Sequence, residues 1–138
     1  SYFMEIYSEL KLGKVSVYMP TQREVPTREI IKSILNSNTK CYLPLIDENL
    51  NNRKMKFSEF THNTTLVKNR FNIQEPQGGS VESASELELV IMPLVAFDNK
   101  GYRLGMGKGY YDSTFNNPTI KRKPLFWKIF LQPSFNMN

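Results

Sequence analysis

The chain has 138 residues, 40% of them hydrophobic and 22% charged, which is the composition of a single soluble globular domain. Its 18 basic and 13 acidic residues give a net charge of +5, which suits an anionic ligand but is too scattered for a nucleic-acid-binding stripe. The single cysteine excludes an internal disulfide, and no apolar run is long enough to span a bilayer. With only one cysteine and one histidine, a His/Cys metal site is implausible. The histidine, His62, lies in a polar stretch typical of a surface loop.

Hydrophobic spacing in the first part of the chain predicts two helices and two strands. Pro26 and Thr27 mark the start of the second helix, with Thr27 as its N-cap, and the run Asn36-Ser37-Asn38 ends it. Pro44 falls within the second strand and limits its hydrogen-bond ladder. The expected elements are a helix over residues 2–10, a strand over 14–19, a helix over 28–35 and a strand over 41–45.

In the second part of the chain, the sequence pattern for secondary structure is weak over residues 55–85 and stronger from residue 87 onward. Residues 55–60 alternate apolar and polar side chains, which weakly favours a strand, and residues 61–85 are so poor in apolar side chains that we expect a surface loop. Residues 87–92 are strongly apolar and predict the central strand, residues 112–116 predict a helix, and residues 125–131 can supply a further strand. This order of elements predicts an α/β sandwich.

The glycine-rich segment over residues 101–112 follows the central strand and contains Gly101, Gly105, Gly107 and Gly109. Glycines let backbone N–H groups approach an anion, and Arg103 and Lys108 can neutralise its charge, so this segment could bind a phosphate group. The same residues also fit a purely structural glycine hairpin. Because ligands bind beyond the carboxyl ends of strands in such sheets, we expect this segment and residues 19–24 to meet at one edge.

The sequence MPLVAFDNKG followed by RLGMGKGYYD resembles the signature of the 5-formyltetrahydrofolate cyclo-ligases, also called methenyltetrahydrofolate synthetases. The similarity extends from about Val15 to Phe115. It implies a three-layer α/β/α sandwich related to sugar-phosphate isomerases and CoA transferases. A single domain over residues 1–138 would then lack part of the family's N-terminal helix and of its C-terminal segment.

The resemblance also implies an activity. With ATP and Mg²⁺ as cofactors, the family converts 5-formyltetrahydrofolate to 5,10-methenyltetrahydrofolate and releases ADP and phosphate. The formyl oxygen takes the γ-phosphoryl group, giving an iminophosphate, and N10 then closes the ring as phosphate leaves. Catalysis of this kind depends on positioning and on charge stabilisation.

The site residues follow from the same resemblance, with Lys108 and Arg103 as the catalytic cations. Asp112 would hold Mg²⁺, and a helix N-cap is an equally compatible role for it. The implied nucleotide site comprises Arg103, Leu104, Gly105, Met106, Gly107, Lys108, Gly109, Tyr110 and Tyr111. The implied folate site comprises Met19, Glu24, Phe71, Met106, Gly107, Lys108, Gly109 and Tyr110.

Several of these roles have structural alternatives. Glu24 can accept hydrogen bonds from the amino-pyrimidinone edge of a pterin, or it can be a solvated loop residue. Phe71 can pack against the pterin or belong to the core, and Asp98 is expected first to form a turn.

Both ends of the chain depart from the family pattern. No Lys or Arg precedes Lys11, so the family's N-terminal phosphate-binding cations have no counterpart, and residues 119–138 contain no Asp or Glu for a second Mg²⁺ carboxylate. The main hypothesis is the cyclo-ligase. The alternatives are a non-catalytic folate- or nucleotide-binding remnant and a nucleic-acid-binding protein. We expect a monomeric, cytoplasmic enzyme whose partner is a small-molecule folate, with or without a polyglutamate tail, and neither nucleic acid nor membrane.

Overall fold

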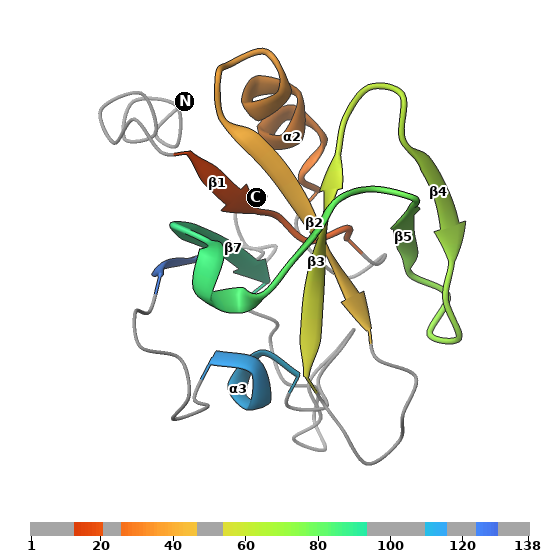
Figure 1. Ribbon diagram of the computed structural model, residues 1–138, viewed down its shortest axis with the longest axis vertical. Coiled ribbons are helices and arrows are strands. Elements are labelled where there is room, and N and C mark those ends of the chain that lie inside the picture. Colours follow the sequence, from red (N-terminus) through yellow and green to blue (C-terminus); the bar gives the residue numbers. More distant parts are fainter. Residues whose placement is uncertain (1–12, 21–25, 47–53, 94–109, 116–123, 130–138) are drawn as a thin grey trace, which may run out of the picture.

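The computed structural model describes residues 13–20, 26–46, 54–93, 110–115 and 124–129 (Figure 1). A six-stranded sheet with the strand order β6-β3-β2-β1-β7-β8 forms its centre. Strands β1, β2, β7 and β8 are mutually parallel, whereas β3 is antiparallel to β2 and β6 is antiparallel to β3. The strands are β1 (Lys14–Ser16), β2 (Lys40–Ile46), β3 (Met55–Phe60), β6 (Val81–Glu82), β7 (Leu89–Pro93) and β8 (Leu125–Ile129).

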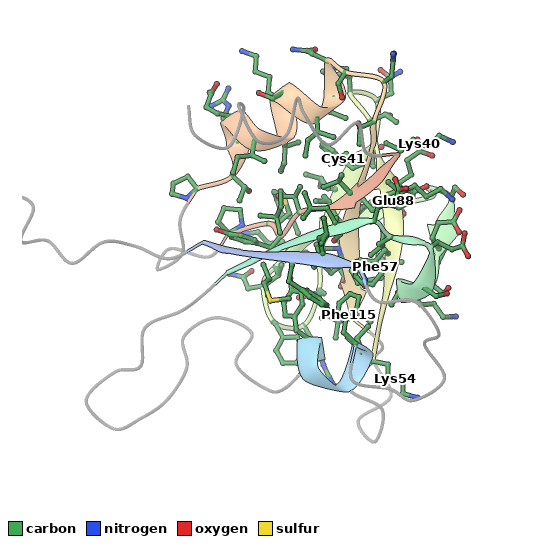
Figure 2. All side chains as sticks on the ribbon, turned by 90° about the vertical axis from the view of Figure 1, so that its left-hand side faces the viewer. Lys40, Cys41, Lys54, Phe57, Glu88 and Phe115 are labelled. Atoms are coloured by element: carbon green, nitrogen blue, oxygen red, sulfur yellow. The ribbon has the colours of Figure 1, made fainter. Side chains whose placement is uncertain are left out.

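Helices cover both faces of this sheet, which gives the three layers expected from the sequence. Helix α2 (Arg28–Leu35) lies on one face, and helix α3 (Tyr110–Phe115) lies on the other (Figure 2). A 3₁₀ turn, η1 (Ala84–Glu86), precedes β7. The α2-side core contains Val15, Val17, Ile31, Ile34, Cys41, Leu43, Leu89 and Ile91, and the α3-side core contains Tyr42, Ile46, Met55, Phe57, Ala84, Leu87, Val90, Met92 and Phe115.

Helix α2 has the bounds that its hydrophobic spacing predicts. Ile31 and Ile34 are buried against the sheet, and Ile30 and Leu35 pack beside them. The N-cap position predicted for Thr27 is confirmed, but a capping hydrogen bond from its side chain is wrong, because that side chain makes no hydrogen bond to the helix. Instead, the fully buried Thr27 hydroxyl donates to the Tyr18 carbonyl oxygen at 2.9 Å, which ties the start of α2 to the segment that follows β1.

The expectation of a surface loop over residues 61–85 is also wrong. Strands β4 (Thr65–Lys68) and β5 (Gln74–Gln77) form an antiparallel hairpin, and β6 and η1 follow it. One side of the hairpin is solvated, with Val67 46% exposed, while Leu66 packs against the α2-side core and Pro76 is buried. A strand pair with so little buried surface needs few apolar residues, and the composition of the segment therefore hid it.

The other strands follow the prediction with small changes at their ends. Strand β3 matches the expected residues 55–60, and β2 and β7 each extend one residue past the prediction at their carboxyl ends. Strand β1 is shorter than expected, although the Val17 N–H still donates to the Tyr42 carbonyl oxygen at 2.9 Å. The expected helix over residues 2–10 lies outside the described residues.

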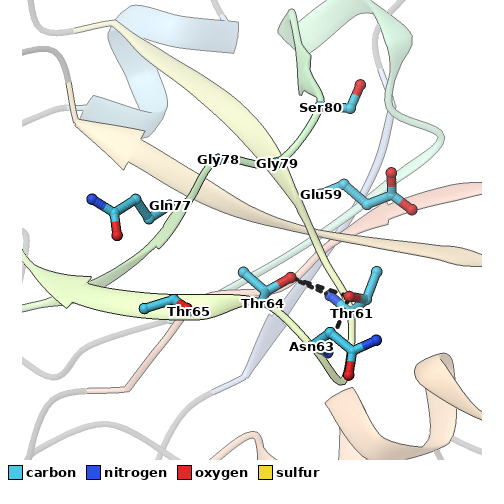
Figure 3. A pocket seen from close by; sticks show the side chains of 9 residues that line it. All are labelled: Glu59, Thr61, Asn63, Thr64, Thr65, Gln77, Gly78, Gly79 and Ser80. Atoms are coloured by element: carbon cyan, nitrogen blue, oxygen red, sulfur yellow. Dashed lines mark hydrogen bonds between the residues drawn. The ribbon is translucent and has the colours of Figure 1, made fainter.

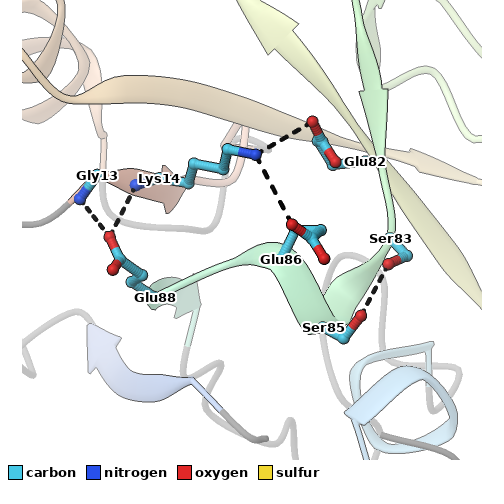
Figure 4. Close-up of polar contacts among 7 residues, drawn as sticks. All are labelled: Gly13, Lys14, Glu82, Ser83, Ser85, Glu86 and Glu88. Carbon is cyan, nitrogen blue, oxygen red and sulfur yellow. Dashed lines mark hydrogen bonds and ion pairs between the residues drawn. The ribbon is translucent and has the colours of Figure 1, made fainter.

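The amino-terminal edge of the parallel strands is held by polar contacts (Figure 4). The Lys14 ammonium donates to Glu82 at 3.2 Å and lies 3.9 Å from Glu86, and the bond to Glu82 is the main reason why the pKa of Lys14 is raised. One carboxylate oxygen of Glu88 accepts the backbone N–H groups of Gly13 and Lys14. These contacts join β6, η1 and the residue before β7 to the start of β1, at the edge opposite to the expected site.

Candidate functional site

The carboxyl edge of the sheet, where β1, β2 and β7 end, is the place where the sequence predicts ligand binding. Strands β1 and β7 are parallel neighbours, with Ser16 beside Val90. The carboxyl ends of these two strands therefore lie side by side. Glu24 and residues 94–109, which include Arg103 and Lys108, lie outside the described residues, so their shared cleft stays a prediction.

The glycine-rich segment leads into helix α3, which is firmly docked on the sheet. Phe115 is 3% exposed, with its ring 5.8 Å from that of Phe57 and 5.2 Å from that of Phe126. The buried Thr114 hydroxyl accepts a hydrogen bond from the Met55 N–H at 2.8 Å. Tyr111 is partly buried against the α3-side core. Helix α3, which directly follows Gly109 in the chain, is therefore fixed against the sheet.

Asp112 is the third residue of α3. The helix begins at Tyr110, two residues before the predicted start, so Asp112 lies in the first turn and is not the N-cap. A carboxylate in the first turn still lies near the positive end of the helix dipole.

A second part of the site is the Phe71 turn, which we define as residues 69–73 at the tip of the β4–β5 hairpin. The Asn69 side-chain oxygen accepts hydrogen bonds from the Phe71 N–H at 2.8 Å and the Ile73 N–H at 3.1 Å. Asn72 adopts a left-handed conformation with φ of 64°, which asparagine tolerates better than most residues. The Arg70 guanidinium lies 4.8 Å from the centre of the Phe71 ring, within the range of a cation–π contact. The backbone of the turn is thus held in one conformation by these contacts.

Glu75 attaches this turn to the carboxyl edge of the sheet. One of its carboxylate oxygens accepts hydrogen bonds from the Asn69 side-chain amide at 2.8 Å and from the N–H of Ile46 at 2.7 Å. Ile46 is the last residue of β2 and pairs with Met55, whose N–H binds Thr114 of α3. A continuous series of backbone and side-chain contacts therefore runs from α3 to the Phe71 turn.

Two of the predicted site residues pack against the same core, and a third packs against the other. Phe71, expected on the folate side, and Tyr111, expected on the nucleotide side, both pack against the α3-side core. Met19 lies just beyond β1 at the same edge, but it packs against the α2-side core. Phe71 is only partly buried, so its packing in the core and a contact of its remaining surface with a ligand are compatible.

The described residues contain no group of three His, Cys, Asp or Glu side chains that could hold a metal ion. Magnesium commonly binds through one or two carboxylates together with phosphate oxygens and water. Asp112, placed where the glycine-rich segment enters α3, fits such a shared site by its position in the fold.

A separate depression of about 260 Å³ opens between the end of β3 and the end of β5 (Figure 3). It is polar, and the hydroxyls of Thr61 and Thr64 on its wall already bind one another and the Thr61 N–H. Because β3 runs antiparallel to β2, its end lies at the amino-terminal edge, away from Phe71 and α3. The lining residues are Glu59, Thr61, Asn63, Thr64, Thr65, Gln77, Gly78, Gly79 and Ser80.

Sequence reasoning missed Asn69, Glu75 and Thr114, which place the elements of the site. Each forms hydrogen bonds to groups that are distant in the sequence or that lie in the same tight turn, and such bonds leave little trace in hydrophobic spacing. The exposed position of His62, in contrast, agrees with the surface loop that its polar neighbours predict. No helix in the described parts of the chain has the length and apolar character needed to cross a membrane.

Comparisons with known proteins point to one family. The 5-formyltetrahydrofolate cyclo-ligase family matches residues 7–131. The chain is 32% identical over 116 residues to the 5-formyltetrahydrofolate cyclo-ligase of Haemophilus influenzae, covering 83% of this chain and 62% of the relative. It is 35% identical over 105 residues to that of Escherichia coli K12 (75% and 57%) and 34% identical over 105 residues to that of Mus musculus (72% and 52%). The chain thus spans less than two thirds of the length of these relatives.

Solved structures agree with this likeness. The NMR structure of Aquifex aeolicus 5,10-methenyltetrahydrofolate synthetase matches with a TM-score of 0.65 and 26% identity, over 97% of this chain and 63% of that protein. A 5,10-methenyltetrahydrofolate synthetase from Mycoplasma pneumoniae matches with a TM-score of 0.54 and 17% identity, over 94% of this chain and 74% of that protein, which supports the fold alone.

Proposed function

The chain belongs to the 5-formyltetrahydrofolate cyclo-ligase family, and from this premise we propose that it converts 5-formyltetrahydrofolate to 5,10-methenyltetrahydrofolate with ATP and Mg²⁺. The observation that supports this proposal is the placement of β7 and α3, the two elements that flank the glycine-rich segment in the chain. That segment joins the carboxyl end of β7 to α3, and α3 shares the α3-side core with the Phe71 turn. Phosphate-binding residues and a folate-binding aromatic ring would then lie at one edge of the sheet.

On the nucleotide side, the chain's own groups supply charge and hydrogen bonds. Gly105, Gly107 and Gly109 would offer backbone N–H groups to the phosphate oxygens, and Arg103 and Lys108 would neutralise the charge that builds up as the γ-phosphoryl group moves to the formyl oxygen. Asp112 would hold the Mg²⁺, whose charge would neutralise further phosphate charge. The products are ADP, phosphate and the closed methenyl ring.

On the folate side, the task is positioning. Phe71 supplies a flat apolar surface for the pterin ring, and Glu24 accepts hydrogen bonds from its amino-pyrimidinone edge. Met19 and Tyr110 complete this side, and Tyr111 faces the nucleotide. Holding N10 close to the activated formyl carbon favours ring closure over reaction with water.

The test is formation of the methenyl absorbance band from 5-formyltetrahydrofolate, ATP and Mg²⁺. Loss of one charged group that stabilises the transition state lowers kcat by roughly 10²–10³-fold, and we expect this of Lys108→Ala. The matched control is Lys32→Ala, which removes an exposed lysine of α2 and should leave turnover unchanged. Product formation that does not depend on Lys108 would contradict the assignment of the glycine-rich segment.

A non-catalytic folate- or nucleotide-binding remnant is the second candidate. Residues 119–138 contain no Asp or Glu that could serve as a second Mg²⁺ carboxylate. Calorimetric binding of ATP and 5-formyltetrahydrofolate without any methenyl product would identify this function.

The remaining assignments follow from the same proposal. The protein acts in the cytoplasm as a monomer on a small-molecule folate, with or without a polyglutamate tail. The buried free thiol of Cys41 suits a reducing compartment.

A further inference from the structure

One carboxylate oxygen of Glu75 joins the Phe71 turn to the end of β2 by hydrogen bonds. That oxygen of Glu75 accepts the Ile46 N–H at 2.7 Å and the Asn69 side-chain amide at 2.8 Å. Ile46 is the last residue of β2 and is 8% exposed, so it belongs to the rigid part of the fold. Glu75 therefore joins a firmly placed strand end to the tip of a solvated hairpin.

Asn69 transmits this constraint to the backbone of the turn. Its side-chain nitrogen donates to Glu75, which requires that its oxygen face the opposite way, toward the N–H groups of Phe71 and Ile73. The backbone adds two further bonds, from the Asn69 N–H to the Ile73 carbonyl at 2.9 Å and from the Asn72 N–H to the Asn69 carbonyl at 2.9 Å. The orientation of the Asn69 amide thus depends on Glu75.

These hydrogen bonds hold Phe71, the aromatic residue of the turn, in place. Phe71 is held by its backbone and by its ring. Its N–H donates to Asn69, and its ring packs on the α3-side core and faces the Arg70 guanidinium. Hairpin tips are ordinarily among the most mobile parts of a domain. A ring on a mobile tip would be a poor platform for a ligand, since ordering it on binding costs conformational entropy.

We propose that Asn69 and Glu75 are positioning residues that preorganise Phe71 for the pterin ring of the folate, an inference that rests on the proposed function. Glu75 does not touch the ligand; it acts through Asn69 and the backbone of the turn. The carboxylate is used for its two hydrogen bonds, and a glutamine oxygen can accept the same two donors.

The test combines folate affinity with the structure of the turn. We expect Glu75→Ala to weaken calorimetric binding of 5-formyltetrahydrofolate by about tenfold, which is the scale of one lost hydrogen bond to a charged group, and to leave the affinity for ATP unchanged. Amide hydrogen exchange at Phe71 and Ile73 should become faster. Glu75→Gln should restore most of the affinity, and Glu86→Ala, at the opposite edge, is the matched glutamate control without effect.

A second variant covers the case in which Glu75→Ala does not fold. Asn69→Ala leaves the bond between Glu75 and the Ile46 N–H in place, and it should weaken folate binding in the same way. In a Phe71→Ala background, Glu75→Ala should cause no further loss of folate affinity, because the ring that it positions is gone.

Two outcomes would overturn the inference. Unchanged exchange at Phe71 and Ile73 in Glu75→Ala would show that the turn does not depend on the carboxylate, and a full tenfold loss in the Phe71→Ala background would show that Glu75 acts by another route. A wild-type chain that binds no folate would instead overturn the proposed function and, with it, the ligand assigned to this turn.

Discussion

Two adjacent glycines, Gly78 and Gly79, offer a sharp test of the fold, because each is required for a different physical reason (Figure 3). A Cβ atom added to Gly79 would lie 2.5 Å from the Glu59 carbonyl oxygen and 2.7 Å from the Ser58 hydroxyl, closer than real Cβ contacts. Gly78 has φ of 82°, and nothing lies within 4 Å of an added Cβ there. Position 79 therefore requires glycine because a side chain would clash with β3, and position 78 favours glycine because its φ is positive.

The expected magnitudes differ accordingly. In Gly79→Ala the chain must move away from β3, which strains the bond between the Glu59 N–H and the Ser80 carbonyl, 2.8 Å long in the native fold. Overpacking costs about 1–3 kcal/mol and a weakened hydrogen bond about 1 kcal/mol, so we expect a loss of roughly 2–4 kcal/mol in the free energy of unfolding. In Gly78→Ala the only cost is that a residue with a side chain must adopt the left-handed conformation, which lowers the free energy of unfolding by about 1–2 kcal/mol.

Urea denaturation measures both losses. The midpoint should fall more in Gly79→Ala than in Gly78→Ala, with the slope of the transition unchanged in each. Gly78→Asn should recover part of the loss at its position, because asparagine tolerates the left-handed region, and it serves as the control. A Gly79→Ala protein as stable as Gly78→Ala would refute the close approach of residues 78–80 to β3.

Two further predictions concern buried groups. Thr114→Val leaves the buried Met55 N–H without its acceptor and should lower the free energy of unfolding, measured in urea, by about 1–3 kcal/mol. Thr114→Ser keeps the hydroxyl and should keep most of the wild-type stability. Equal stability of the two variants would contradict the docking of α3. Burial raises the pKa of the Cys41 thiol from 9.0 to about 12, so the unfolded chain ionises first and the thiol's contribution to stability is lost as the pH rises from 9 toward 12. The urea midpoint should therefore fall less above pH 9 in Cys41→Ala than in the wild type, and identical pH profiles would contradict this.

Elements with a strong local pattern could be predicted from the sequence. The bounds of α2 follow from isoleucines at helical spacing and from the Asn-Ser-Asn run that ends it, and β7 follows from an apolar run that is buried on both faces. The glycine-rich segment was identified by its resemblance to the family, and its residues Arg103 to Gly109 remain a predicted site.

The sequence by itself therefore determined which segments are helical or extended wherever one face or both faces must be buried, since that requirement is written in the spacing of apolar residues. Only the tertiary structure decided that β1 lies between β2 and β7, that Thr27 binds the Tyr18 carbonyl and that Glu75 joins the Phe71 turn to β2. These contacts link residues between 9 and 74 positions apart in the chain. Their partners are chosen by three-dimensional packing and by the need to satisfy buried polar groups, and local propensity does not encode either choice.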